Sequence, residues 1–191
     1  MSVEAFAVST GVVALGEMGD KTQLLALLLA ARFRKPLPII AGILVATLAN
    51  HAAASALGAW LTQAIDPTWL RWLLGASFIA VALWMLAPDQ ASTDAPGGPA
   101  SKLGVFGITV IVFFLAEMGD KTQIATVILA ARFDALSAVV LGTTLGMMLA
   151  NVPAVLLGDK LIKWVPIRWV HLAAALAFAG LGVAVLFGAG G

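Results

Sequence analysis

Long apolar stretches separated by short polar segments run through the whole chain and predict membrane-spanning helices. A spanning helix needs about 20 apolar residues, and six stretches reach or approach that length. The predicted spans are residues 3–31, 36–65, 69–87, 103–131, 135–157 and 169–187. Residues 88–101 are polar and rich in Pro, Gly and Ser, so we expect a flexible linker in water. The chain therefore divides into a first repeat (1–87), this linker and a second repeat (102–191).

The first and fourth predicted spans are longer than the hydrocarbon core of a bilayer. As continuous helices, residues 3–31 and 103–131 would each measure about 42 Å, against a core of about 30 Å. We expect both helices to be tilted, broken or partly re-entrant. Each carries a glutamate at its centre, Glu17 in the first and Glu117 in the fourth.

The heptapeptide Glu-Met-Gly-Asp-Lys-Thr-Gln occurs twice, at residues 17–23 and 117–123. The same offset relates other positions of the two halves: Gly42 and Gly142, Leu57 and Leu157, Gly58 and Gly158, Trp69 and Trp169, Phe78 and Phe178. Asn50 and Asn151 match with a slip of one residue. We interpret this correspondence as an internal duplication that covers nearly the whole chain.

Each half contains three predicted spans, and this odd number determines its orientation. After three crossings the chain is on the opposite side of the membrane, so the second half inserts upside down relative to the first. The predicted fold is therefore an all-α membrane protein with six transmembrane helices in two inverted three-helix repeats. Both heptapeptides are expected near the midplane of the bilayer, where binding sites of such transporters lie.

Composition agrees with a membrane protein and excludes several other classes. The chain is 61% hydrophobic and 11% charged, with a mean hydropathy of +1.02, whereas about a quarter of the residues in soluble domains are charged. A net charge of +1 with no basic face argues against nucleic acid as a partner. The chain has no cysteine, so a metal would have only oxygen and nitrogen ligands.

Basic residues outside the heptapeptides are distributed unevenly across the predicted topology. Seven of them share one side: Arg32, Arg34, Lys35, Lys102, Lys160, Lys163 and Arg168. Only Arg71 and Arg132 fall on the other side. The positive-inside rule therefore places the larger group in the cytoplasm and both termini outside.

The heptapeptides place four carboxylates, which we call the motif acids, in apolar surroundings. They are Glu17, Asp20, Glu117 and Asp120. Ionisable residues inside a membrane are costly and mark functional sites by default. On a helix the two acids of one copy are three positions apart and share a face, so four carboxylates converge if the copies meet. Such hard oxygen ligands suit Ca²⁺, Mn²⁺ or Mg²⁺, and we predict the motif acids as metal ligands.

Other polar residues near the motif acids are secondary candidates for the site. They are Lys21, Thr22, Gln23, Lys121, Thr122, Gln123, Asn50 and Asn151. Gly19 and Gly119 allow close helix approach or local unwinding. Structural alternatives for the lysines are an ion pair such as Glu17–Lys21 or a snorkelling position at the mouth of a cavity. For the asparagines, the alternative is a hydrogen bond between helices. His51 is either a proton relay or a buried, hydrogen-bonded histidine.

Charge counting connects the predicted site to transport. With every group ionised, four acids and two lysines leave a net charge of −2, which one divalent cation or two protons would neutralise. Like charges and desolvation both favour the protonated form of an empty site, so metal and protons compete for the same oxygens. This predicts a secondary transporter that exchanges a divalent cation for protons; no cofactor is expected.

Two other functions stay open on the sequence alone, and a third is not expected. Rings of acidic residues also form divalent cation channels. A small-solute exporter could have the same size, although the site lacks the arginine that a carboxylate-bearing solute would bind. An enzyme is not expected, because neither His-Glu-x-x-His nor Gly-x-Ser-x-Gly occurs in the chain.

The doubled Glu-x-Gly-Asp-Lys-Thr motif, three spans per half and the polar linker resemble uncharacterised protein family 0016 over essentially all of the chain. Members are similar to the Golgi manganese/calcium–proton exchangers of eukaryotes, their chloroplast relatives and bacterial manganese exporters. The resemblance implies export of a divalent cation from a site formed by the motif acids, with Mn²⁺ as the main cation and Ca²⁺ as its competitor. It also implies a compact prokaryotic member in the inner or plasma membrane; a homo-oligomer is left open.

Overall fold

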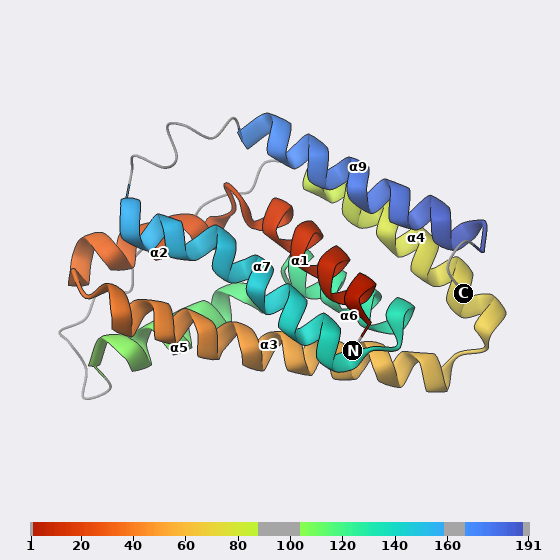
Figure 1. The fold of residues 1–191 in the computed structure, drawn as a ribbon, viewed down its shortest axis with the longest axis horizontal. Helices are drawn as coiled ribbons and strands as arrows, with labels where there is room; N and C mark the ends of the chain where they lie inside the picture. Colours follow the sequence, from red (N-terminus) through yellow and green to blue (C-terminus); the bar gives the residue numbers. More distant parts are fainter. Residues whose placement is uncertain (1, 88–103, 159–166, 189–191) are drawn as a thin grey trace.

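The computed structural model describes residues 2–87, 104–158 and 167–188, and within these parts all regular structure is helical (Figure 1). Its helices are α1 (Val3–Glu17), α2 (Lys21–Phe33), α3 (Pro36–Ala64), α4 (Pro67–Met85), α5 (Gly104–Glu117), α6 (Lys121–Phe133), α7 (Leu136–Leu157) and α9 (Ile167–Leu186). The predicted linker and the basic residues Lys102, Lys160 and Lys163 lie outside the described residues.

Among the described residues, four helices are long and apolar enough to cross a membrane: α3, α4, α7 and α9. They coincide with the second, third, fifth and sixth predicted spans. The first and fourth predicted spans are each divided into two shorter helices, α1 with α2 and α5 with α6. The chain is thus an all-α membrane protein. Of the three expected forms of the long spans, the broken one is found, and the inverted repeat of six spans stays a prediction.

Both breaks lie inside the heptapeptides and depend on a glycine. Gly19 has φ of 84° and Gly119 has φ of 76°, a left-handed conformation that glycine adopts without steric cost. Asp20 and Asp120 then become the N-cap residues of α2 and α6. The expectation that the two acids of one copy share a face of one helix was wrong, because the helix ends between them.

The first helix of each half packs on the long helix of the other half: α1 lies along α7, and α5 lies along α3. Glycines allow both contacts. A Cβ atom added to Gly142 would lie 2.6 Å from the carbonyl oxygen of Phe6, and one added to Gly42 would lie 3.0 Å from that of Phe106. The two contacts involve residues related by the same offset, so the duplication in the sequence is repeated in the packing.

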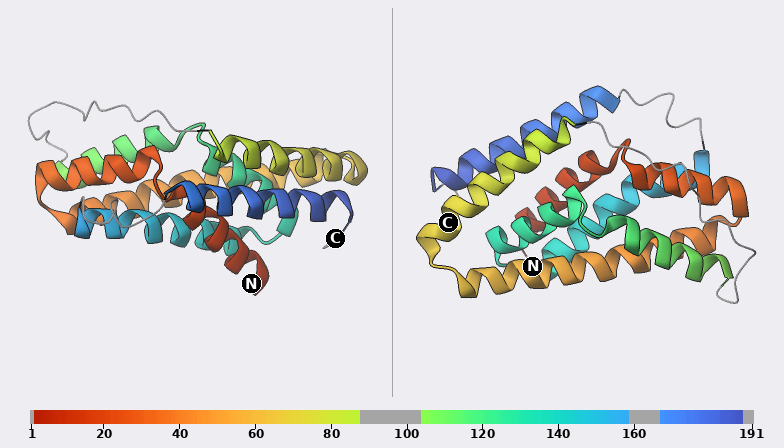
Figure 2. Two further views of the ribbon diagram at one scale, coloured as in Figure 1. Left: turned by 90° about the horizontal axis from the view of Figure 1, so that it is seen from above. Right: turned by 180° about the vertical axis from the view of Figure 1, so that it is seen from behind.

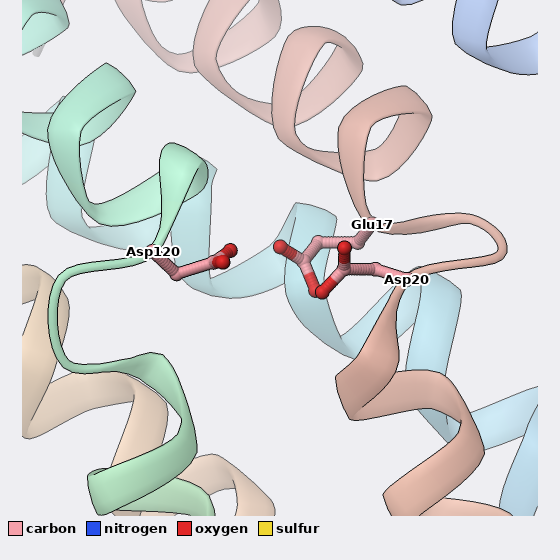
Figure 3. A group of neighbouring side chains, drawn as sticks. All are labelled: Glu17, Asp20 and Asp120. Carbon is pink, nitrogen blue, oxygen red and sulfur yellow. The ribbon is translucent and has the colours of Figure 1, made fainter. Parts of the chain in front are cut away.

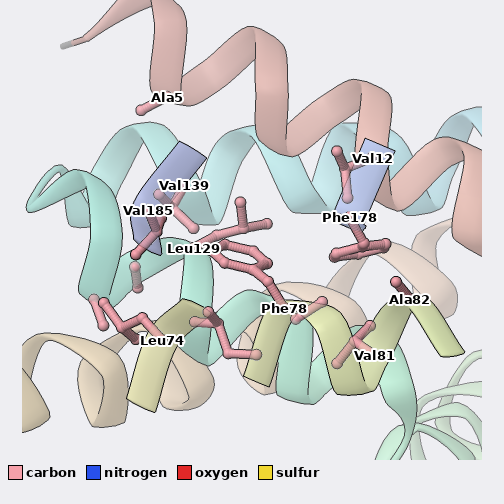
Figure 4. Packing of buried hydrophobic residues seen from close by; sticks show 14 of the residues in the cluster. Ala5, Val12, Leu74, Phe78, Val81, Ala82, Leu129, Val139, Phe178 and Val185 are labelled. Atoms are coloured by element: carbon pink, nitrogen blue, oxygen red, sulfur yellow. The ribbon is translucent and has the colours of Figure 1, made fainter. Parts of the chain in front are cut away.

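Helices α4 and α9 lie side by side along one flank of the other helices (Figures 1 and 2). The rings of Phe78 and Phe178 are 6.3 Å apart between centroids. Leu129 of α6 and Val139 of α7 belong to the same buried cluster (Figure 4). This cluster attaches the α4–α9 pair to α1, α6 and α7, while a second apolar cluster joins α2, α3, α5 and α7.

Gly142→Ala is expected to destabilise the protein by about 1–3 kcal/mol, because the added methyl group forces α1 away from α7. The measurement is the thermal unfolding of the purified protein in detergent. Gly180→Ala is the matched control, since no heavy atom of the described residues, apart from its own helix backbone, lies within 4 Å of a Cβ atom at that position. Equal unfolding temperatures for the two variants would contradict the packing described here.

Candidate cation site

The two breaks bring carboxylates from both halves together inside the bundle (Figure 3). Glu17, Asp20 and Asp120 each offer one oxygen, and these three oxygens lie within 4.8 Å of one another. None of the three residues is more than 4% exposed. Because hard cations bind carboxylate oxygens at about 2.0–2.6 Å, one ion could contact all three. We call this group the carboxylate triad.

Glu117, the fourth predicted ligand, is buried beside the triad but is not part of it. Its Oε2 atom accepts a hydrogen bond from the Thr122 hydroxyl at 3.4 Å, and the same hydroxyl lies 3.2 Å from Asp120 Oδ2. A hydroxyl has one proton to donate, so Thr122 donates to one of these carboxylates at a time. Thr122 therefore connects Glu117 to the triad.

The first heptapeptide contains the equivalent threonine contact. Thr22 donates a hydrogen bond from its hydroxyl to Glu17 Oε2 at 2.8 Å. The Oε1 atoms of Glu17 and Glu117 are buried and have no hydrogen-bond donor among the residues that the structure describes. Buried polar atoms without a partner are unfavourable, and a cation or a proton bound at these atoms would remove that cost.

Two ion pairs cross between the heptapeptides. Lys21 Nζ lies 2.7 Å from Asp120 Oδ1, and Lys121 Nζ lies 3.3 Å from Asp20 Oδ1. Lys21 therefore pairs with an acid of the other copy, and not with Glu17 as the spacing along a continuous helix suggested. Each half supplies the counter-charge of the other half.

The two glutamines stabilise the breaks. Gln23 Oε1 accepts a hydrogen bond from the Gly19 N–H at 2.9 Å, and Gln123 Oε1 accepts one from the Gly119 N–H at 2.7 Å. In addition, Gln23 Nε2 donates to the Ala150 carbonyl of α7 at 2.9 Å. The amide oxygens of both glutamines are thus engaged by the backbone of their own heptapeptides.

The two asparagines have different partners. Asn50 donates to the Phe114 carbonyl of α5 at 3.0 Å, a bond between helices, whereas Asn151 donates to the Met147 carbonyl of its own helix at 3.1 Å. Helices α3 and α7 are unbroken and begin 100 residues apart, so Asn151 is the counterpart of His51, and the match of Asn50 with Asn151 expected from the sequence was wrong. The imidazole of His51 is buried, with no hydrogen-bond partner in the described parts of the chain.

One contact at the site has no signal in the sequence. The Nε2 atom of His171, in α9, lies 3.0 Å from the carbonyl oxygen of Met18 in the first break. With the proton on Nε2, His171 donates this hydrogen bond. The contact joins residues 153 positions apart, and it holds α9 against the first break.

Buried acids between two broken helices of an apolar bundle are typical of secondary transporters that carry cations. A family model described as "Divalent cation/proton antiporter GDT1" matches residues 5–93 and 105–191. The chain belongs to this family of divalent cation/proton antiporters. The family resemblance that the heptapeptides suggested is confirmed.

Several curated proteins are similar to this chain over about three quarters or more of their own length. A Vibrio cholerae serotype O1 protein named "Putative manganese exporter" is 50% identical over 98% of this chain and 92% of the relative. GDT1-like protein 5 of Arabidopsis thaliana is 27% identical over 95% of this chain and 94% of the relative. GDT1-like protein 3 of Oryza sativa subsp. indica is 26% identical over 96% and 74%. No solved structure gives a significant match.

Thr22→Val is expected to lower the free energy of unfolding by about 1–3 kcal/mol, because it removes the hydroxyl that donates to the buried Glu17 carboxylate. Thr126→Val is the control: its hydroxyl, also buried, donates to the Thr122 carbonyl one turn earlier in the same helix. Thermal unfolding of both variants at the same pH measures the difference. A loss no larger for Thr22→Val than for Thr126→Val would contradict the role given to Thr22.

Proposed function

We propose that this protein exports Mn²⁺ across the membrane in exchange for protons and that the carboxylate triad holds the ion. The observation that carries the proposal is the meeting of Glu17, Asp20 and Asp120, from both heptapeptides, within 4.8 Å in a buried position. Oxygen ligands of this kind suit Mn²⁺ and also Ca²⁺. The relative named as a manganese exporter, at 50% identity, supports Mn²⁺ as the main cation.

Glu117 completes the charge of the proposed site. Through Thr122 it lies next to Asp120, and with it the four motif acids and the two motif lysines carry a net charge of −2 when all are ionised. One divalent cation or two protons balance that charge. Because both would bind the same oxygens, a site loaded with Mn²⁺ excludes the protons, and a protonated site releases the Mn²⁺. This competition is the basis of the exchange.

We further propose that α1–α2 and α5–α6 each form one broken crossing, giving six crossings in two inverted halves within a lipid bilayer. The path of the chain along the long axis of the bundle supports this, because successive spans run in alternating directions (Figure 1). The matched contacts of Gly42 and Gly142 with the first helix of the other half support it too. We place the protein in a prokaryotic inner or plasma membrane with both termini outside, the orientation that the positive-inside rule favours.

In liposomes containing the purified protein, the rate of Mn²⁺ transport is expected to depend on the pH gradient across the membrane. Nigericin, which dissipates this gradient, is expected to stop net transport. Glu17→Gln, Asp20→Asn and Asp120→Asn should each reduce the initial rate at least tenfold, because each removes one charged ligand. Glu117→Gln should reduce proton-driven transport through the loss of the fourth charge.

Glu4→Gln serves as the control, since Glu4 is an exposed acid in the first turn of α1, and its rate should equal that of the wild type. Fast Mn²⁺ flux that ignores the pH gradient would indicate a channel instead. Wild-type rates in both Glu17→Gln and Asp120→Asn would exclude the triad as the transport site.

A further inference from the structure

We propose that Lys21 is a displaceable counter-ion of the cation site. Its ammonium group leaves Asp120 when a divalent cation binds and returns to Asp120 when the cation leaves. Lys121, its counterpart in the second heptapeptide, stays with Asp20 in the conformation seen here. This inference rests on the proposed function, namely transport of a divalent cation at the carboxylate triad.

Lys21 and the cation need the same carboxylate. The Nζ atom of Lys21 lies 2.7 Å from Asp120 Oδ1, and Asp120 is a member of the triad. A divalent cation takes carboxylate oxygens at about 2.0–2.6 Å, so an ammonium group kept on Asp120 would lie directly beside a doubly charged ion. Like charges at such short separation repel strongly inside a protein. Binding of the cation therefore favours the departure of the lysine.

The two motif lysines differ in how freely they can move. The Lys21 side chain is 32% exposed, whereas that of Lys121 is completely buried. Lysine carries its charge on a flexible stem of four carbons, so Lys21 can turn towards the surface while α2 stays in place. For Lys121 to leave Asp20, its ammonium group would have to move through packed protein. Only Lys21 can leave its partner without a rearrangement of helices.

The surroundings of the two breaks account for this difference. Asp120 follows the second break, where Met118 is 58% exposed and Gly119 is also exposed. Asp20 follows the first break, which α9 covers through the hydrogen bond between His171 and the Met18 carbonyl. Of the two ion pairs, Lys21–Asp120 thus has a partly exposed lysine, whereas both members of Lys121–Asp20 are buried.

Displacement can be measured on the unmodified wild-type protein by brief acetylation of amines with an N-hydroxysuccinimide ester, followed by peptide mass spectrometry. Saturating Mn²⁺ is expected to raise the acetylation of Lys21 at least threefold, because the amine is released from its carboxylate. Lys121 should stay protected with and without Mn²⁺, and the exposed Lys35 should react equally in both. Unchanged or reduced acetylation of Lys21 at saturating Mn²⁺ would overturn the proposal.

Substitution of Lys21 provides an independent measurement. Lys21→Met keeps the length of the side chain and removes the competing charge, so calorimetric titration should show Mn²⁺ binding at least tenfold tighter than in the wild type. Transport turnover should fall, because no ammonium group replaces the departing ion. Lys21→Arg keeps the charge and should bind Mn²⁺ within about threefold of the wild type.

If the Lys21–Asp120 ion pair were purely structural, its loss would weaken Mn²⁺ binding or leave it unchanged. Either result for a folded Lys21→Met protein would overturn the proposal. If the wild-type protein binds no Mn²⁺ in the same titration, the proposed function itself fails. That outcome is distinct from Mn²⁺ binding without release of Lys21.

Discussion

The need to balance buried negative charge in an apolar bundle governs the rest of this structure. Charged groups inside a membrane persist only when they are paired or line a polar site. Here Lys21 pairs with Asp120 and Lys121 with Asp20, so the aspartate of each heptapeptide is neutralised by the lysine of the other one. Neither half could bury its own aspartate in this way alone. The duplication is therefore more than a repeated fold, because the two aspartates find their lysine partners only where the two copies meet.

The broken helices follow from the same requirement. A continuous helix would direct its polar side chains along one face, whereas the turns at Gly19 and Gly119 let a glutamate and an aspartate approach one point from two helix ends. The positive ends of the α2 and α6 dipoles then lie next to Asp20 and Asp120, their N-cap residues, where negative charge is favoured. Broken helices of this kind form the ion sites of many transporters.

The four unbroken spans and the duplicated acids could be predicted from the sequence because apolar length and a repeated heptapeptide are local signals. The crossed ion pairs could not be predicted in the same way. The four-residue spacing of Glu17 and Lys21 suggests an ion pair between these two residues, but only in a continuous helix, and the turn at Gly19 ends the helix. The role of Gln23 depends on that same turn. The contact of His171 with the first break arises from the packing of α9, which no local pattern encodes.

The account depends most directly on where the ion binds. Anomalous diffraction at the manganese absorption edge, from crystals of the Mn²⁺-loaded protein, would locate it without assumptions about mechanism. The structure predicts a single buried peak with carboxylate oxygens of Glu17, Asp20 and Asp120 at about 2.0–2.6 Å. A buried manganese ion that is coordinated by other residues, while Lys21 and Lys121 stay paired with Asp120 and Asp20, would contradict the central claim.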